Sequence, residues 1–280
     1  MTQAIATGYA PTAGSAPHSN SPRHRFYRRV LRALNAAGID FVIGGGYALE
    51  RHLGIGRPTK DLDLFLRPAD VKAALGHFRS IGFDAELTFP HWLAKVTRRD
   101  DQVDLIFNGG NGICPVDDDW FRYAIPARVL GVPVKLSPVE EMIWSKAFVM
   151  ERERYDGADI AHLILRQGDR LDWSRLLRRF GPDWRVLMSY LVMFGYVYPS
   201  ERARVPQRVV NDLTQRLRDE AETPPPAEKV CGGTVVSRLQ YLPDVNDWGF
   251  RDVRHDSRVH MSDSDIALWT RAALAQGDKE

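Results

Sequence analysis

The sequence is 280 residues long and 44% hydrophobic, with a formal net charge of +2 at pH 7 and two cysteines. This length and composition allow one large domain or two smaller ones, each with its own core. The small net charge does not indicate the strongly basic surface typical of nucleic-acid binders. Cys114 and Cys231 are far apart, which argues against a disulfide framework or a zinc site. We therefore expect any metal to be held mainly by oxygen.

The sequence shows no pattern typical of a membrane span or a signal peptide. No run of about eighteen apolar residues occurs, and no basic segment precedes an apolar stretch. We therefore expect neither a membrane-spanning helix nor a signal peptide, and a cytoplasmic location. Residues 1–22 are rich in Ala, Gly, Ser, Thr and Pro without apolar periodicity, which predicts a disordered tail.

Residues 23–136 alternate between helical and strand patterns. The first helix is expected over 23–37, where apolar residues recur on one face, and Gly38 ends it. The elements expected next are a strand at 41–43, a glycine turn at 44–46, a helix at 47–53, a strand at 62–66, a helix at 71–81, strands at 92–97 and 103–107, and an edge strand at 132–136. This order predicts a catalytic domain of the α/β (α+β) class with a mixed sheet.

Helical patterns dominate the chain after residue 136. Ser137-Pro138-Val139-Glu140 matches a capping box with proline at the first helical position and predicts a helix start. Further helices are expected at 156–167, 172–180, 184–194 and 206–218. We interpret residues 137–222 as a helical domain that closes over the substrate. Residues 223–280 begin with a Thr-Pro-Pro-Pro linker and form an extension, with a helix expected at 264–274, whose role the sequence does not indicate.

Three aspartates form the candidate catalytic centre. Successive side chains of a strand point to opposite faces, so Asp61 and Asp63 point the same way, while Leu62 and Leu64 point into the core. Asp104 lies at the start of another strand that can pair beside the first. Carboxylates are the oxygen ligands that Mg²⁺ prefers, and two Mg²⁺ ions about 4 Å apart can neutralise the charge that develops in nucleotidyl transfer.

The competing interpretation is a half-exposed strand that carries alternating acids without any catalytic role. The glycine run at residues 44–46 favours the metal site, because it lies between an expected strand and an expected helix. Backbone amides and the helix dipole at such a turn bind the phosphates of a nucleotide. A glycine run without the acids would more often be only a tight turn, so the combination carries the prediction.

Together these segments resemble the DNA polymerase β-type nucleotidyltransferase superfamily, whose members have a GG or GS turn, a short helix, and then a DxD or DxE strand. The matching segments are Gly45-Gly46-Tyr47-Ala48-Leu49 and Arg57-Pro58-Thr59-Lys60-Asp61-Leu62-Asp63-Leu64. A late acid, a segment over 132–138 and a helical lysine also match its bacterial small-molecule and toxin-like branch, although Val139-Glu140 replaces the more usual immediate glutamate. The resemblance covers roughly residues 25–165.

The resemblance implies a nucleotidyltransferase that moves a nucleoside monophosphate, AMP in the first instance, from an NTP such as ATP to an acceptor and releases pyrophosphate. It implies that Asp61 and Asp63 hold two Mg²⁺ ions, and that Asp104 holds the catalytic ion and assists deprotonation of the acceptor hydroxyl. It further implies that Gly45 and Gly46 position the triphosphate.

Three basic residues are candidates for contacts with the nucleotide. Arg57 and Lys60 lie beside the acids, although charges next to a strand are commonly only solvated. Lys146 falls in the middle of an apolar helical face, where an ammonium group needs a partner or a polar cavity. It either reaches the triphosphate or forms a salt bridge with Asp156 or Asp159, and the sequence leaves both interpretations open.

The acceptor can be a small molecule, an RNA or a protein. An aminoglycoside-like polycation would need an acidic pocket, for which residues 117–119 and Glu86 are candidates. An RNA would need basic and aromatic surface, for which the candidates are Arg175, Arg178, Arg179, Trp184 and Arg185. The alternative from another class is a non-catalytic nucleotide-binding or antitoxin-like regulatory module on the same fold, which the complete set of three acids disfavours.

Overall fold

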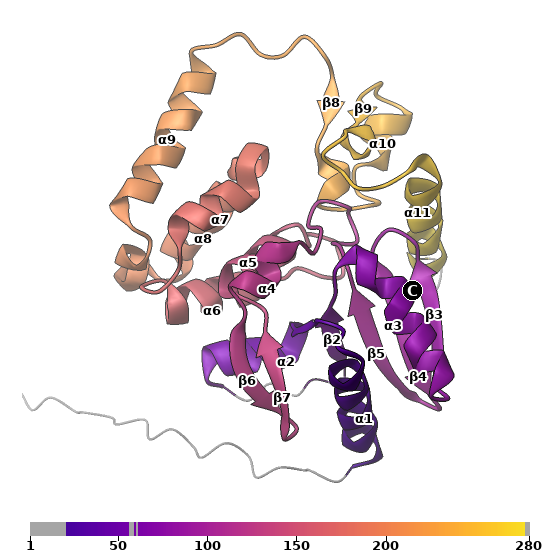
Figure 1. Ribbon diagram of the computed structural model, residues 1–280. Coiled ribbons are helices and arrows are strands. Elements are labelled where there is room, and N and C mark those ends of the chain that lie inside the picture. Colours follow the sequence, from indigo (N-terminus) through magenta and orange to yellow (C-terminus); the bar gives the residue numbers. More distant parts are fainter. Residues whose placement is uncertain (1–20, 56–58, 60, 278–280) are drawn as a thin grey trace, which may run out of the picture.

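The computed structural model describes residues 21–55, 59 and 61–277 (Figure 1). The tail expected at residues 1–22 therefore falls outside the described residues, apart from its last two positions. Two candidate phosphate-binding residues, Arg57 and Lys60, also lie outside them. In the part of the chain that is described, no helix is long and apolar enough to cross a membrane.

Within the described residues, seven strands form one mixed sheet in the order β3-β4-β5-β2-β1-β7-β6. The strands are β1 (Val42–Ile43), β2 (Leu62–Phe65), β3 (Asp84–Phe89), β4 (Leu93–Arg98), β5 (Asp101–Ile106), β6 (Ile125–Val129) and β7 (Val132–Leu136). β2 is parallel to β5 and β1 is parallel to β7, whereas the other neighbours are antiparallel. The predicted α/β class with a mixed sheet is confirmed.

Three helices accompany the first strands: α1 (Pro22–Ala37), α2 (Gly45–Leu53) and α3 (Pro68–Ser80). At the start of α1 the Ser21 side chain accepts a hydrogen bond from the backbone N–H of His24 at 3.1 Å. At its end Gly38 adopts a left-handed conformation with φ of 67°, which suits glycine. Leu31 and Leu34 are fully buried. The helix expected over 23–37 is thus formed, with a cap at each end.

A helical layer follows the sheet. It contains α5 (Val139–Ala147), α6 (Gly157–Gln167), α7 (Trp173–Phe180), α8 (Trp184–Val197) and α9 (Gln207–Ala221), with the short α4 (Asp118–Arg122) before β6 and the 3-10 helices η1 (Gly181–Asp183) and η2 (Pro199–Arg204) between the later helices. Ile143, Ile160 and Leu176 are fully buried in the same hydrophobic cluster as Leu64 and Leu105 of the sheet. The sheet and the helical layer therefore share one core.

Two expectations about local structure were wrong. The strand at residues 132–136 does not lie at the edge of the sheet, because β6 pairs along its outer side. The capping box at the start of α5 is not formed: Pro138 is the N-cap, and the buried Ser137 hydroxyl has no hydrogen-bond partner among the described residues. Glu140 instead accepts a hydrogen bond from the backbone N–H of Asp172 at 2.7 Å, so tertiary contacts override the local pattern.

The C-terminal extension folds back onto the sheet. It contains β8 (Val230–Cys231), η3 (Gly233–Val235), α10 (Leu242–Asn246), β9 (Arg251–Asp252), η4 (Val253–His255) and α11 (Asp263–Gly277), and β8 pairs in parallel with β9. Trp269 of α11 contacts Phe89 of β3 edge to face, with ring centroids 4.7 Å apart. Figure 1 shows α11 beside β3, far from α9, which precedes the linker.

Candidate functional site

Asp63 and Asp104 lie side by side on neighbouring parallel strands. β2 and β5 pair in a register that sets Asp63 opposite Asp104. Leu62 and Leu64, which flank Asp63, are fully buried on the other face of the sheet. The two carboxylates therefore share one face, at the roughly 5 Å spacing of adjacent strands. Asp61 lies just before β2 and is exposed.

The glycine turn lies directly against Asp63. The backbone N–H of Gly44 donates to the carbonyl oxygen of Asp63 at 3.0 Å. Gly45 has a φ of 52°, and a Cβ at this position would lie 1.6 Å from Oδ2 of Asp63. A Cβ on Gly46 would lie 2.7 Å from the Thr59 side chain. Glycine is therefore required at residue 45 both by conformation and by the carboxylate above it.

The environment of the acids favours their neutral forms. Burial raises the pKa of Asp63 to about 6, and the charges of Asp104 and Asp61 act in the same direction against Arg154 and Lys146. Burial also raises the pKa of Asp104, although nearby Lys95 and a hydrogen bond from Gln102 oppose the shift. Gln102 Nε2 donates to Oδ1 of Asp104 at 2.6 Å. A cation at this site would relieve the repulsion between the carboxylates.

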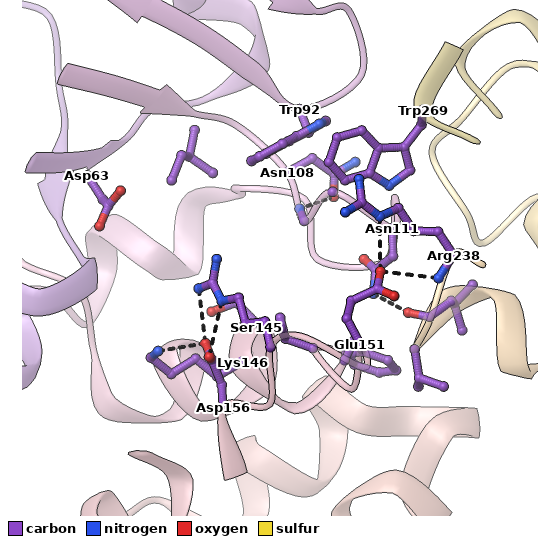
Figure 2. A pocket seen from close by; sticks show the side chains of 18 of the residues that line it. Asp63, Trp92, Asn108, Asn111, Ser145, Lys146, Glu151, Asp156, Arg238 and Trp269 are labelled. Carbon is purple, nitrogen blue, oxygen red and sulfur yellow. Dashed lines mark hydrogen bonds and ion pairs between the residues drawn. The ribbon is translucent and has the colours of Figure 1, made fainter. Parts of the chain in front are cut away.

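These acids open onto a pocket of about 300 Å³ (Figure 2). Its wall is formed by the glycine turn with β2 and β5, by Trp92 and the loop after β5, by α5 with the loop that follows it, and by the C-terminal extension. These parts contribute Gly45, Asp63, Asp104, Lys146, Arg238 and Trp269, among others. Asp61 is not among the described residues that line the pocket.

Lys146 lines this pocket and is held by an ion pair on each side. Its Nζ donates to Oδ2 of Asp156 and to Oδ2 of Asp159, both at 2.8 Å. Arg154 donates from Nε and Nη2 to the two oxygens of Asp156, each at 3.2 Å, and it also lines the pocket. The structural salt bridge considered for Lys146 is therefore present. Its contact with a triphosphate stays a prediction.

The C-terminal extension supplies the far wall of the pocket. The Glu151 carboxylate accepts hydrogen bonds from the Ser237 hydroxyl at 2.8 Å, from the backbone N–H of Arg238 at 3.2 Å and from its Nε at 3.0 Å. The Arg238 guanidinium lies over the ring of Trp269, 4.2 Å from its centroid. Trp269 meets Trp92 edge to face with centroids 5.2 Å apart. The extension is thus joined to the loop after α5 and to the segment before β4.

The donor set at β2 and β5 fits Mg²⁺. Two neighbouring carboxylates offer hard oxygen ligands, and the charge of Asp104 contributes to the raised pKa of Asp63. Among the described residues, no three Asp, Glu, His or Cys side chains are close enough together to hold an ion by themselves. Mg²⁺ is usually bound through one or two carboxylates together with phosphates and water. The pair therefore suits an ion that is shared with a phosphate ligand.

A mixed sheet with acids on two parallel strands beside a glycine turn is the arrangement expected of a nucleotidyltransferase, and the chain is one. Residues 23–180 match the family described as "Nucleotidyl transferase of unknown function (DUF2204)", and the chain belongs to this family. The predicted membership in the nucleotidyltransferase superfamily is confirmed. The match stops at the end of α7, so the C-terminal wall of the pocket lies beyond it.

Solved nucleotidyltransferases are similar to the chain at low identity. The antibiotic-resistance factor ANT(2'')-Ia is 17% identical with a TM-score of 0.39, and the match covers 61% of this chain and 96% of that one. The lincosamide antibiotic adenylyltransferase LnuA, solved with lincomycin bound, is 13% identical with a TM-score of 0.36, over 51% and 96%. An antigenic nucleotidyltransferase-like protein from Paracoccidioides brasiliensis is 17% identical with a TM-score of 0.34, over 59% and 90%. No curated protein matches the chain.

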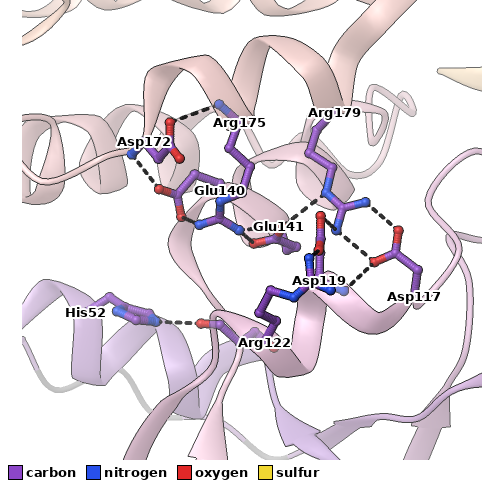
Figure 3. A network of polar contacts seen from close by, with 10 residues as sticks. His52, Asp117, Asp119, Arg122, Glu140, Glu141, Asp172, Arg175 and Arg179 are labelled. Atoms are coloured by element: carbon purple, nitrogen blue, oxygen red, sulfur yellow. Dashed lines mark hydrogen bonds and ion pairs between the residues drawn. The ribbon is translucent and has the colours of Figure 1, made fainter.

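Internal ion pairs occupy most of the charges considered for acceptor binding (Figure 3). Arg179 donates to both oxygens of Asp117, at 2.5 and 2.8 Å. Arg175 is only 4% exposed and pairs with Glu140 and Glu141. The interpretation of Arg175 as part of a basic surface was therefore wrong, because this residue is buried. Arg179 is half-buried and is engaged by the exposed Asp117 and the buried Glu141.

Sequence reasoning missed several residues in or beside the candidate site. Gln102 lies two positions before Asp104 on one strand, so the period-two rule places both on one face and could have identified it. Arg154 was assigned no role at the site. Arg238 and Trp269 follow the acids by more than a hundred positions, and no local pattern connects them to β2 or β5.

Proposed function

We propose that the protein is a Mg²⁺-dependent enzyme that moves the nucleoside monophosphate of an NTP, with ATP as the first candidate, to an acceptor hydroxyl and releases pyrophosphate. The observation that carries the proposal is the meeting of Asp63 and Asp104 above Gly45. A side chain at residue 45 would collide with the Asp63 carboxylate. The absence of a Cβ keeps the acids next to the backbone amides that begin α2.

Different residues of this site would bind different parts of the metal–nucleotide complex. Asp63 and Asp104 would hold Mg²⁺ together with phosphate oxygens, and Asp61 adds a third negative charge nearby. When bound, the ions neutralise charge on the phosphates and on the attacking and leaving oxygens. Gly45 and Gly46 begin α2, whose free N–H groups and dipole attract the triphosphate. Lys146 and Arg154, both paired with Asp156, lie on the opposite wall of the pocket and are the candidates there for contacts with the phosphates.

Asp104 is also the candidate for accepting the proton of the acceptor hydroxyl. The 2.6 Å hydrogen bond from Gln102 to Oδ1 restricts the rotation of the carboxylate and leaves Oδ2 as the oxygen that can take the proton. Gln102 is thus a positioning residue for Asp104.

The test measures nucleotide binding and chemistry separately. Isothermal titration of ATP with and without Mg²⁺ should show that the ion strengthens binding in the wild-type protein. Asp63→Asn and Asp104→Asn should remove this strengthening and reduce pyrophosphate release to background, because each loses an anionic ligand without a change in size. The matched control is Asp84→Asn, which changes an exposed acid on the edge strand β3 and should behave as wild type.

Full pyrophosphate release by both site variants would refute the assignment. A wild-type protein that binds Mg²⁺ and ATP but releases no pyrophosphate with any acceptor tested would instead be the non-catalytic nucleotide-binding module. The two measurements together therefore separate the enzyme from that alternative.

A further inference from the structure

We infer that the end of the pocket between Trp92, Asn108 and Trp269 binds the acceptor, and that this acceptor is a small uncharged molecule with an apolar or aromatic ring face and oxygen atoms that accept hydrogen bonds. The inference rests on the proposed function and names the substrate class of the same site. It gives the C-terminal extension, which lies beyond the family match, a direct part in substrate selection.

The order of the strands separates a nucleotide side from an acceptor side. The glycine turn follows β1, the acids lie on β2 and β5, and Trp92 immediately precedes β4 on the other side of the acids. In nucleotidyl transfer the attacking and leaving oxygens lie roughly in line across the phosphorus. A triphosphate on the glycine turn therefore leaves the side toward Trp92 for the attacking hydroxyl. Figure 2 shows Asp63 on one side of the pocket and Trp269 on the other, with Trp92 between them.

Charge at the acceptor end is already neutralised. Glu151 is paired with Arg238 and receives a further hydrogen bond from Ser237. Asp156, nearer the centre of the pocket, is paired with Lys146 and Arg154. Four acids are among the described residues that line the pocket, and Glu151 and Asp156 are taken up by these ion pairs. Asp63 and Asp104 are assigned to the metal, so no carboxylate is left to bind a polycation. This pairing disfavours an acceptor of the aminoglycoside type.

The size and the apolar lining of the pocket agree with a small ring compound. The whole pocket, including its metal end, has a volume of about 300 Å³, at the lower end of the range for small-molecule sites, so the part near Trp92 and Trp269 suits only a small compound. Beside the two tryptophans, the wall contains Phe148, Val149 and Val236. Aromatic side chains arranged edge to face present a ring surface to which a planar or apolar ligand face can pack.

One hydrogen-bond donor at this end has no acceptor among the described residues. Asn108 lines the pocket and is only 4% exposed; its Oδ1 accepts from the backbone N–H of Gly109 at 2.8 Å, whereas no residue in the described part of the chain accepts from its amide nitrogen. An unpaired amide at a largely buried position favours a ligand that can accept its hydrogen bond. A ligand with hydroxyl, ether or carbonyl oxygens would supply that acceptor.

The test uses the full chain and direct binding without turnover. The probes are a panel of neutral aryl glycosides, beginning with 4-nitrophenyl β-D-glucoside, together with tobramycin as a polycation and a short single-stranded RNA. Binding is measured by isothermal titration and by saturation-transfer NMR. We expect at least one neutral glycoside to bind more tightly than tobramycin and the RNA. Failure of the whole neutral panel, or tighter binding of tobramycin or the RNA, would overturn the inference.

Two variants locate the bound probe. Asn108→Asp keeps the oxygen that accepts from Gly109 and removes the amide donor, so it should weaken binding of the neutral probe about tenfold. Trp269→Leu removes the ring surface and should weaken binding roughly three- to tenfold. The control is Trp248→Leu, which changes a 63% exposed tryptophan of the same extension and should bind as wild type. Equal affinity in all three variants would place the probe elsewhere and overturn the assignment.

The Trp269→Leu variant also keeps this inference distinct from the proposed function. Mg²⁺-ATP affinity should be unchanged in Trp269→Leu, because this substitution changes no charge and lies on the opposite side of the pocket from Asp63, and it also reports that the variant is folded. If wild type binds the glycosides but not Mg²⁺-ATP, the proposed function fails and the ring-binding pocket survives. If it binds Mg²⁺-ATP but none of the glycosides, only the acceptor inference fails.

Discussion

Replacing Gly45 by alanine tests the closest contact in the candidate site. The new methyl group would meet two separate obstacles. Gly45 has a φ of 52°, and its Cβ would lie 1.6 Å from Oδ2 of Asp63. Gly38 provides the matched control, because its φ is 67° and a Cβ there meets nothing within 4 Å. The two substitutions therefore share the conformational cost and differ in the collision.

The expected free energies follow from these two contributions. A left-handed alanine costs about 1–2 kcal/mol, which is the whole effect expected for Gly38→Ala. Forcing a methyl group against Asp63 adds roughly 1–3 kcal/mol of overpacking. Gly45→Ala should therefore destabilise the protein by about 2–5 kcal/mol in total. It should also displace the carboxylate and weaken Mg²⁺-dependent nucleotide binding.

A double-mutant cycle separates the collision from the conformational cost. Unfolding by urea is measured for wild type, Gly45→Ala, Asp63→Ala and the double variant. If Asp63 is the obstacle, Gly45→Ala should cost about as little in the Asp63→Ala background as Gly38→Ala costs in wild type. Additive effects of the two substitutions, or equal losses for Gly45→Ala and Gly38→Ala in wild type, would refute the reasoning.

Two further predictions concern buried charge. Arg175→Met leaves Glu140 and Glu141 without their principal partner and should cost about 3–5 kcal/mol in urea unfolding, whereas the exposed Arg178→Met should cost under about 0.5 kcal/mol; similar losses would contradict this. Burial raises the pKa of Asp63 from 3.8 to about 6, so ionising this acid destabilises the folded state progressively as the pH rises between these values. Asp63→Asn should therefore be more stable than wild type at pH 8, by up to about 3 kcal/mol, and the advantage should shrink toward pH 4. A stability gain of Asp63→Asn that grows as the pH falls would contradict this prediction.

Local patterns were sufficient for the elements that carry the acids. The strand with Asp63 and the strand with Asp104 were expected from short apolar runs, and glycine marked the turn before α2. The side-by-side pairing of β2 and β5 followed from the need to bring the acids together rather than from any pattern in either strand. The site roles of Asp61, Asp63 and Asp104 remain predictions that the variants above test.

Other features depend on contacts that no local pattern contains. β3 and β6 were missed, because their side chains are mostly exposed or half-exposed and give little hydrophobic signal. The capping box predicted at Ser137 is not formed, because the Glu140 side chain makes an ion pair with Arg175 instead of bonding back to the helix start. The pocket wall at Arg238 and Trp269 depends on long-range packing after a proline-rich linker.

The late position of that wall has a consequence for how the protein becomes functional during translation. A ribosome completes the stretch from Gly45 to Asp156 before it begins the segment with Arg238 and Trp269. Domains generally fold in the order of synthesis. A nascent chain can therefore assemble its acids and glycine turn while the opposite side of the pocket is still open to water. On the inferences above, such a chain would bind the nucleotide before the part of the pocket that selects the acceptor has formed.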